Sequence, residues 1–464
     1  MRATTSTWRR GGPLRGAALL LGALALQAGG AAANECRTAE SRDGAVEMDP
    51  TWAGTTVGYA ALQRGGIVYF GYYDAERRLT VASLDPRSRR LCVRTLDAVF
   101  GGWDSHNGIV MAFDSGGRLH VAGNMHGTGL IYARASEPDD VASLRPAGMV
   151  GTDEARVTYP RFVRGDDGNL LFVYRSGASG RGEWIVNRWA DGRWARVSAQ
   201  PVFAANWQGR PVSAYPSPFV ADERGVFHVA IVWRHTGDAA TNFAVSYAAT
   251  RDFQTWRGAD GRRLTAPLTP DTADSIERRG EGQGLLNAPI AAADERGQPM
   301  VAYTRYGPGG NNAVFLAKPE GSGWTTHLLV ESDRRVPIEG TGTLPDVPRL
   351  RELDPDEGTI LVAFPGRAAF RYGFDPVTLE PRGSAVRARA ADSRPSPARP
   401  IPGLGRSALR RVPVLDAASG QRLPGRFEFF AQAGNGDRPV ACTADAPKAC
   451  DPPPSPVYFV QGGH

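Results

Sequence analysis

Two histidines, a tyrosine and an arginine lie in four short polar segments between residues 103 and 180, and these side-chain types suit acid–base chemistry. The four residues are His106, His126, Tyr159 and Arg175. Imidazole and phenol groups transfer protons when their surroundings tune them. A guanidinium offers two parallel donors to a carboxylate and neutralises its charge. The set therefore suits proton transfer next to a carboxylate group.

Other polar residues, in these segments or in two later ones around 215 and 234, are candidates for binding a substrate. They are Asn107, Asn124, Arg161, Tyr215 and Arg234. Two further histidines, His120 and His228, occupy matching positions in the repeats described below, each next to apolar neighbours. We expect both of these histidines to be structural.

A repeated turn-and-strand pattern indicates which elements position these residues. An Asp-x-x-Gly turn, or a close variant of it, precedes alternating apolar residues at Asp114, Asp166, Asp222, Asp294 and Asp356. Such turns supply the positive φ values that tight hairpins need, and the alternation predicts strands with one buried side. The copies recur at roughly fifty to seventy residues, which is about one four-stranded blade with its loops. The sequence predicts an all-β protein with a β-propeller fold; the alternative is one or two β-sandwiches.

The repeats run without a linker, so we expect residues 34–464 to form a single propeller domain in which the first and last strands meet in one blade. A Pro- and Arg-rich stretch around 381–413 is predicted to be a surface insertion. Loops from several blades converge at the mouth of a propeller, which is where the polar segments are expected to gather.

Residues 1–33 have the layout of a secretory signal peptide. A basic start precedes an apolar stretch at residues 17–26, and Ala31–Ala33 then offers a cleavage site. The apolar stretch is short for a membrane span, which needs ~20 residues. We therefore predict a secreted or periplasmic protein with no membrane span in the mature chain. Arg9 and Arg10 leave open whether export uses the general or the twin-arginine route.

Charge and cysteine content fit this location. The formal net charge is +6, but four of the basic residues lie in the predicted signal peptide, so that the remainder is close to neutral and we expect no nucleic-acid partner. An even number of cysteines in an exported chain favours disulfides. Of the three possible pairings we prefer Cys36–Cys92 with Cys442–Cys450.

The segments containing His106-Asn107, Gly123-Asn-Met-His126, Thr158-Tyr-Pro160 and Tyr174-Arg-Ser-Gly177 together resemble the BNR-4 repeat group. Within that group they are similar to ulvan lyases and related rhamnose–glucuronate lyases, and the likeness covers most of Tyr59 to Trp194. The resemblance implies a seven-bladed propeller and β-elimination at a uronic acid in an acidic polysaccharide. It places the catalytic residues at His106, His126, Tyr159 and Arg175. The zinc-binding cysteine and histidine set of that family has no clear counterpart, so we expect no metal and no cofactor.

Each of the four residues can be given a role in such a reaction. Arg175 and His126 would neutralise and orient the uronate carboxylate, Tyr159 would transfer a proton, and His106 would be either the base or a second stabiliser. Because Tyr159 precedes Pro160, we expect its backbone to be extended. Two rival functions remain open, a sialidase-like glycoside hydrolase and a non-catalytic carbohydrate-binding propeller. In each case we expect a monomer.

Overall fold

The computed structural model describes residues 35–462 except 166, 345 and 389–394. The predicted signal peptide therefore lies outside the described residues. Within them, no helix is long and apolar enough to cross a membrane. The described chain is almost entirely β-strand, with two short 3₁₀ turns, η1 (Val141–Ser143) and η2 (Ala239–Thr241). The all-β prediction is confirmed.

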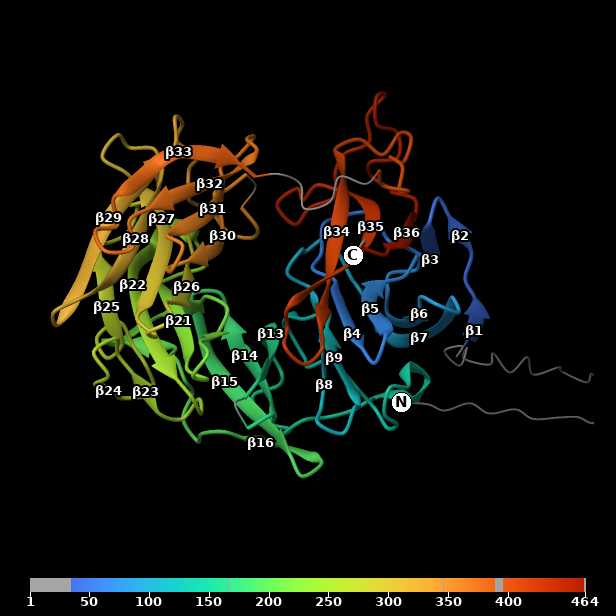
Figure 1. Ribbon diagram of the computed structural model, residues 1–464, viewed down its shortest axis with the longest axis horizontal. Coiled ribbons are helices and arrows are strands. Elements are labelled where there is room, and N and C mark those ends of the chain that lie inside the picture. The colour runs from blue at the N-terminus through green and yellow to red at the C-terminus, as the bar shows by residue number, and fades with distance from the viewer. Residues whose placement is uncertain (1–34, 166, 345, 389–394, 463–464) are drawn as a thin grey trace, which may run out of the picture.

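The strands form antiparallel units that follow one another along the chain and lie side by side in space (Figure 1). The first unit is β4 (Ala60–Arg64), β5 (Ile67–Tyr73), β6 (Arg78–Asp85) and β7 (Arg90–Val99), with β1 (Glu35–Thr38) paired outside β7. The second is β8 (Ile109–Phe113), β9 (Leu119–Gly123), β11 (Tyr132–Ala135) and β12 (Leu144–Pro146). The third is β10 (His126–Thr128), β13 (Val157–Arg164), β14 (Leu170–Ala178), β15 (Arg181–Ala190) and β16 (Arg193–Arg196).

The middle of the chain continues the same arrangement. One unit contains β19 (Ser213–Pro216), β20 (Val220–Ala221), β21 (Phe227–Arg234), β22 (Asn242–Thr250), β23 (Trp256–Arg257), β24 (Arg263–Leu264) and β25 (Asp274–Arg278). A separate small hairpin is formed by β17 (Asn206–Trp207) and β18 (Arg210–Pro211). Two four-stranded sheets follow: β26 (Ile290–Ala293), β27 (Pro299–Tyr306), β28 (Asn312–Glu320) and β29 (Gly323–Glu331), then β30 (Arg349–Asp354), β31 (Thr359–Ala363), β32 (Ala369–Phe374) and β33 (Pro381–Arg387).

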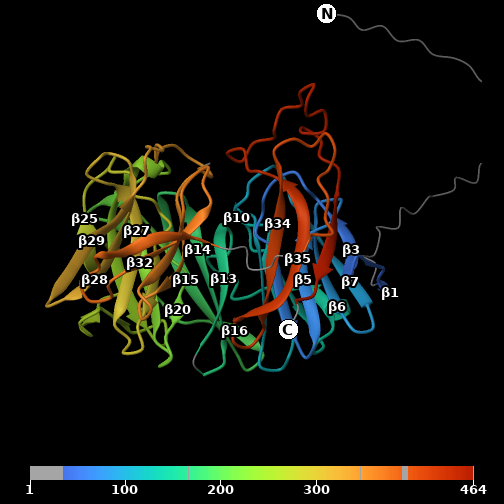
Figure 2. The same ribbon diagram turned by 45° about the horizontal axis from the view of Figure 1, so that its top comes forward.

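The last unit joins the two ends of the chain. It consists of β34 (Ser407–Asp416), β35 (Arg422–Gln432), β36 (Ser455–Val460), β3 (Ala45–Thr51) and β2 (Ser41–Arg42). Strand β3 pairs antiparallel with β36, so N-terminal and C-terminal strands meet in one blade, and the two lie together in both views (Figures 1 and 2). The very first strand, β1, pairs with β7 instead. The protein is a β-propeller. Its blade count stays a prediction, because parallel contacts of β4 with β34 and of β15 with β19 merge neighbouring units into larger sheets.

The predicted turns form the expected hairpins where the structure describes them. The amide of Gly117 donates to the carbonyl of Asp114, and Gly225 makes the same bond to Asp222. Both glycines have positive φ, +76° and +73°, which costs a residue without Cβ little. The apolar residues that follow are buried in clusters between neighbouring sheets.

The prediction of a surface insertion at 381–413 is wrong at both ends of that stretch. Its first residues form β33, the outer strand of its sheet, and its last residues belong to β34. All seven residues of β33 are exposed, so the strand has the polar composition of a loop. Pro381 is tolerated because it begins an edge strand. Residues 389–394 lie outside the described part.

Both predicted disulfides are present. Cys36–Cys92 connects β1 to β7, and Cys442–Cys450 closes a short segment of the loop between β35 and β36. No cysteine is left free.

Candidate active site

Three neighbouring strands bring two of the predicted catalytic residues onto one face of a sheet. His126 in β10 lies opposite Thr158 in β13, and Thr158 lies opposite Arg175 in β14. Side chains of directly opposed residues point to the same face. The strand register therefore places His126 and Arg175 in one row.

A bulge in β13 turns Tyr159 toward this row. The pairing of β13 with β14 is interrupted between Thr158 and Arg161, and Tyr159 has a φ of +55°. The expectation of an extended backbone before Pro160 is therefore wrong, because the bulge outweighs the local preference. A positive φ is uncommon for a bulky residue, and bulges often re-aim a side chain beside a functional site. The Tyr159 ring centre lies 5.7 Å from that of His106 and 4.8 Å from the guanidinium carbon of Arg175.

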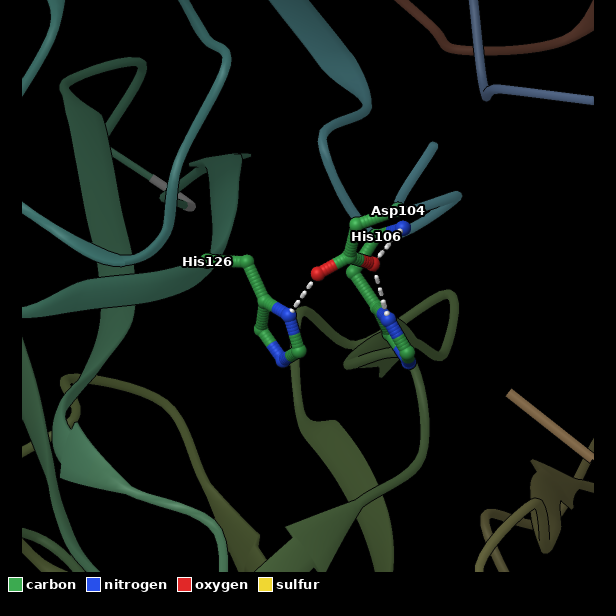
Figure 3. A group of neighbouring side chains, drawn as sticks. All are labelled: Asp104, His106 and His126. Carbon is green, nitrogen blue, oxygen red and sulfur yellow. Dashed lines mark hydrogen bonds and ion pairs between the residues drawn. The ribbon is translucent and has the colours of Figure 1, made fainter. Parts of the chain in front are cut away.

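A single carboxylate holds both predicted catalytic histidines (Figure 3). Asp104 and His106 lie in the turn between β7 and β8, where an Asp104 oxygen accepts from the His106 backbone amide at 2.9 Å and its Nδ1 at 2.6 Å. The other oxygen of Asp104 bonds Nδ1 of His126. The two rings stack with centres 4.2 Å apart, and their Nε2 atoms point away from the carboxylate (Figure 3).

The environment of Asp104 keeps it ionised. Burial raises the pKa of this carboxyl, but hydrogen bonds from the two imidazoles outweigh burial, so that the pKa lies well below its ordinary value. An ionised carboxylate only accepts, so each histidine donates from Nδ1 and its Nε2 is left for another partner. Asp104 was not among the residues predicted to form the site. The Asp-x-His spacing, which lets an aspartate bond the amide two residues on, is the signal that could have identified it.

Two buried arginines lie beside Tyr215 without a carboxylate partner. Arg175 and Arg234 are 1% and 6% exposed, and both approach the Tyr215 hydroxyl, at 3.5 and 3.2 Å. Arg234 also donates to the side-chain oxygens of Asn242 and Asn287. Within the described part of the chain, the hydrogen-bond partners of both guanidiniums are uncharged oxygen atoms rather than carboxylates. A buried cation without a counter-charge is costly, so this pair favours binding of an anion.

These side chains surround a pocket of about 290 Å³. Its polar lining consists of His106, His126, Tyr159, Ser179, Arg234, Asn287, Thr341 and Thr343. Its apolar lining consists of Leu286, Ala288, Leu344 and Val347. Arg175 lies directly behind Tyr159 and Tyr215 rather than in the wall itself. Burial raises the pKa of Tyr159 more than the nearby Arg175 lowers it, so its hydroxyl keeps its proton at neutral pH.

Four predicted substrate-binding residues are not among the residues that line this pocket. One is Tyr215, whose hydroxyl contacts both buried arginines; the other three are Asn107, Asn124 and Arg161. The side-chain amides of Asn107 and Asn124 each donate to a backbone carbonyl, at 3.0 and 2.8 Å. Arg161 donates to the carbonyls of Pro216 and Ser217, and burial lowers its pKa to about 10. Because their donors are used on the backbone, we assign these three residues to holding the loops around the pocket. Conversely, Ser179, Asn287 and the apolar wall were not predicted.

His120 and His228 are structural, as expected. Each is buried and lies between an aspartate of the preceding turn and a tyrosine of a neighbouring strand. The partners are Asp114 and Tyr132 for His120, and Asp222 and Tyr247 for His228. Burial lowers the pKa of both imidazoles more than the aspartates raise it.

The geometry of the Asp104 group fits hydrogen bonding better than metal binding. Asp104, His106 and His126 are the only group of this kind found in the described chain, with one ligand atom from each lying within 4.8 Å of the others. Two ligands that share a zinc ion at its usual bond lengths stay roughly 3 Å or more apart. The contact between an Asp104 oxygen and Nδ1 of His106, at 2.6 Å, is closer than that. All four cysteines are in disulfides, so none can complete a zinc site.

Comparison with known proteins agrees with this architecture. Residues 67–331 match a family model described as a BNR repeat-containing family member. None of the curated proteins matches the chain. A PL25 ulvan lyase, solved with -[GlcA(1-4)Rha3S]- bound, has a TM-score of 0.57 and 15% sequence identity. The alignment covers 84% of this chain and 94% of the ulvan lyase chain. Polysaccharide lyase Uly1 has a TM-score of 0.55 and 13% sequence identity, and the alignment covers 87% of this chain and 90% of the Uly1 chain. At these identities the likeness establishes the fold alone.

Proposed function

The chain belongs to the BNR repeat-containing family, and from that premise we propose that it is a polysaccharide lyase that cleaves a uronate-containing acidic polysaccharide by β-elimination. The observation that carries the proposal is the pair of buried, unpaired guanidiniums of Arg175 and Arg234 beside three proton-transfer groups. An anionic substrate supplies the missing counter-charge. The similarity of the fold to an ulvan lyase solved with -[GlcA(1-4)Rha3S]- bound, and to a second polysaccharide lyase, supports the same proposal.

The arginines would make the proton at C5 removable. That proton lies next to the uronate carboxylate, whose negative charge opposes formation of a second charge on C5. Arg234 faces the pocket and is held by Asn287, so it is placed to bind the carboxylate. Arg175, behind the wall, adds positive potential. Charge that is fixed before the reaction stabilises the enolate-like transition state without reorganisation.

Proton transfer is divided between a histidine and Tyr159. With Asp104 accepting from both Nδ1 atoms, the Nε2 of His106 or His126 is free to take the C5 proton. The electrons of the C5–H bond form the C4–C5 double bond as the C4–O4 bond breaks. Tyr159, which keeps its proton because burial raises its pKa, would donate it to the leaving O4 atom. Tyr159 is then the acid, and one of the histidines is the base.

The two rival functions receive less support from the pocket. A hydrolase of the usual kind needs a carboxylate pair or an equivalent nucleophile system, and no carboxylate is among the described residues that line the pocket. A non-catalytic binding protein has no need for one carboxylate to orient two stacked histidines. For the polymer we propose rhamnose–glucuronate linkages such as those of ulvan. Secretion or export to the periplasm is part of the proposal, and two disulfides support it.

The test is incubation of the purified protein with a panel of acidic polysaccharides. A lyase creates an unsaturated uronate, which absorbs in the near ultraviolet, and new reducing ends appear in equal number. Reducing ends without absorbance would identify a hydrolase. Binding with neither product would identify a non-catalytic carbohydrate-binding protein, and in both cases the proposal would be wrong.

A further inference from the structure

Asp437 reaches the pocket from a distant part of the chain. It lies in the loop between β35 and β36, the same loop that contains the Cys442–Cys450 disulfide. One carboxylate oxygen accepts from the backbone amide and the hydroxyl of Ser105, at 3.2 and 3.3 Å. The other accepts from the backbone amide of Thr343 at 2.7 Å. Asp437 thus connects three loops that follow β7, β29 and β35.

The two residues that Asp437 holds are both next to the candidate catalytic group. Ser105 lies between Asp104 and His106 in sequence. Thr343 lines the pocket, and its hydroxyl lies 2.8 Å from the Ser105 hydroxyl and 3.4 Å from Nδ1 of His106. Movement of the Asp437 carboxylate would therefore be transmitted to the turn that contains His106.

The surroundings of Asp437 indicate a fixed carboxylate rather than a mobile surface group. Its side chain is 17% exposed, and its own φ is +62°. A Cβ atom added at Gly342 would lie 3.0 Å from a carboxylate oxygen, so the glycine lets the two loops approach. Hydrogen bonds to an ionised acceptor are roughly twice as strong as neutral ones, and Asp437 accepts three of them.

We propose that Asp437 is a positioning residue that holds His106 and Thr343 in the positions that the reaction requires. This inference rests on the proposed lyase function. It goes beyond the family likeness, because Thr343 and Asp437 both lie outside the matched residues 67–331. The carboxylate is 4.0 Å from Nδ1 of His106, so it acts through Ser105 and Thr343 rather than by touching the substrate.

The first arm of the test is kinetic. Asp437→Asn replaces one acceptor oxygen by an amide NH2 group, which donates and would face the donors of Ser105 or Thr343, so the carboxylate contacts cannot all persist. We expect kcat to fall about tenfold or more, since small misplacements of a reacting group are costly, with KM changed much less. Asp445→Asn, an exposed carboxylate of the same loop, is the matched control and should behave as wild type. In a His106→Gln background, Asp437→Asn should lower kcat no further.

The second arm needs no activity. Nitrogen-15 NMR of the histidine rings, with the His106 signal assigned through His106→Gln, should show that signal displaced by Asp437→Asn and unmoved by Asp445→Asn. If Asp437→Asn does not fold, Thr343→Val keeps the side-chain shape, removes the hydroxyl contacts and should displace the same signal.

The two arms separate the two proposals. Wild type that makes no unsaturated product from any polymer overturns the lyase function, while a displaced His106 signal still supports the positioning role. An unmoved His106 signal overturns the positioning role. The positioning role is also overturned if Asp437→Asn has the same kcat as Asp445→Asn. It is overturned too if Asp437→Asn lowers kcat by the same factor in the His106→Gln background as in wild type.

Discussion

Replacing Tyr159 by phenylalanine removes one oxygen atom from the pocket and keeps the ring. Within the described chain the Tyr159 hydroxyl has no hydrogen-bond partner, whereas the ring packs beside Arg175 and stacks near Trp184. The variant should therefore lose no protein hydrogen bond, and its free energy of unfolding should stay within about 1 kcal/mol of wild type. If Tyr159 donates the proton to O4, kcat should fall by ~10²-fold or more, which corresponds to about 2.7 kcal/mol of transition-state stabilisation.

The assay is steady-state formation of unsaturated uronate on a polymer that the wild type cleaves, with thermal melts alongside. Tyr132→Phe is the matched control, because the Tyr132 hydroxyl bonds His120 and Trp194 away from the pocket. That variant should lose about 1–3 kcal/mol of stability and keep its kcat. Retention of more than about a tenth of wild-type kcat by Tyr159→Phe would refute the assignment of Tyr159 as the acid, since the expected loss is ~10²-fold.

Three other perturbations test the rest of the site. Arg234→Ala and Arg175→Ala should each lower kcat and not merely raise KM, because the enolate charge grows in the transition state. On a polymer whose carboxyl groups are esterified, both substitutions should lower kcat by a smaller factor. An equal loss of kcat on the esterified and the free polymer would contradict the role of these arginines in neutralising the carboxylate. Asp104→Asn should lower the melting temperature most near neutral pH. The difference in melting temperature between Asp104→Asn and wild type should narrow as pH falls below about 4. The pKa of Asp104 is lower in the folded than in the unfolded protein, so its carboxylate stabilises the fold above the unfolded-state pKa, and that stabilisation is lost as the pH falls further. Dialysis against a chelator should leave activity unchanged, and loss that zinc restores would show that the expectation of no metal is wrong.

Much of the fold could be predicted from local chemistry. The turns at Asp114 and Asp222 are specified by an aspartate and a glycine three residues apart, and the following strands by alternation, so both are readable in a short window. Strand β33 could not be found in this way. Its residues are all exposed, so no alternation marks it, and only its pairing with β32 makes it a strand.

The site was predictable only in part, because polar residues at strand ends have two possible uses. Asn107 and Asn124 were chosen for the same reason as His106 and His126, but their amides bond the backbone. Nothing local in the sequence distinguishes these cases. Asn287 and Thr343 come from loops remote in sequence, and only the closed ring brings them to the pocket.

The roles that we propose for His106, His126 and Tyr159 follow from their surroundings rather than from their intrinsic chemistry. A phenol next to a guanidinium is expected to ionise more easily, and on that ground Tyr159 could have been the base. Its burial outweighs the effect of Arg175 and raises its pKa, so the proton stays in place and is available to the leaving group. Asp104 has the complementary effect on the histidines, because it engages both Nδ1 atoms and leaves the two Nε2 atoms as acceptors. In the proposed mechanism, one partly buried carboxylate and one partly buried phenol thus separate the base from the acid within a single pocket.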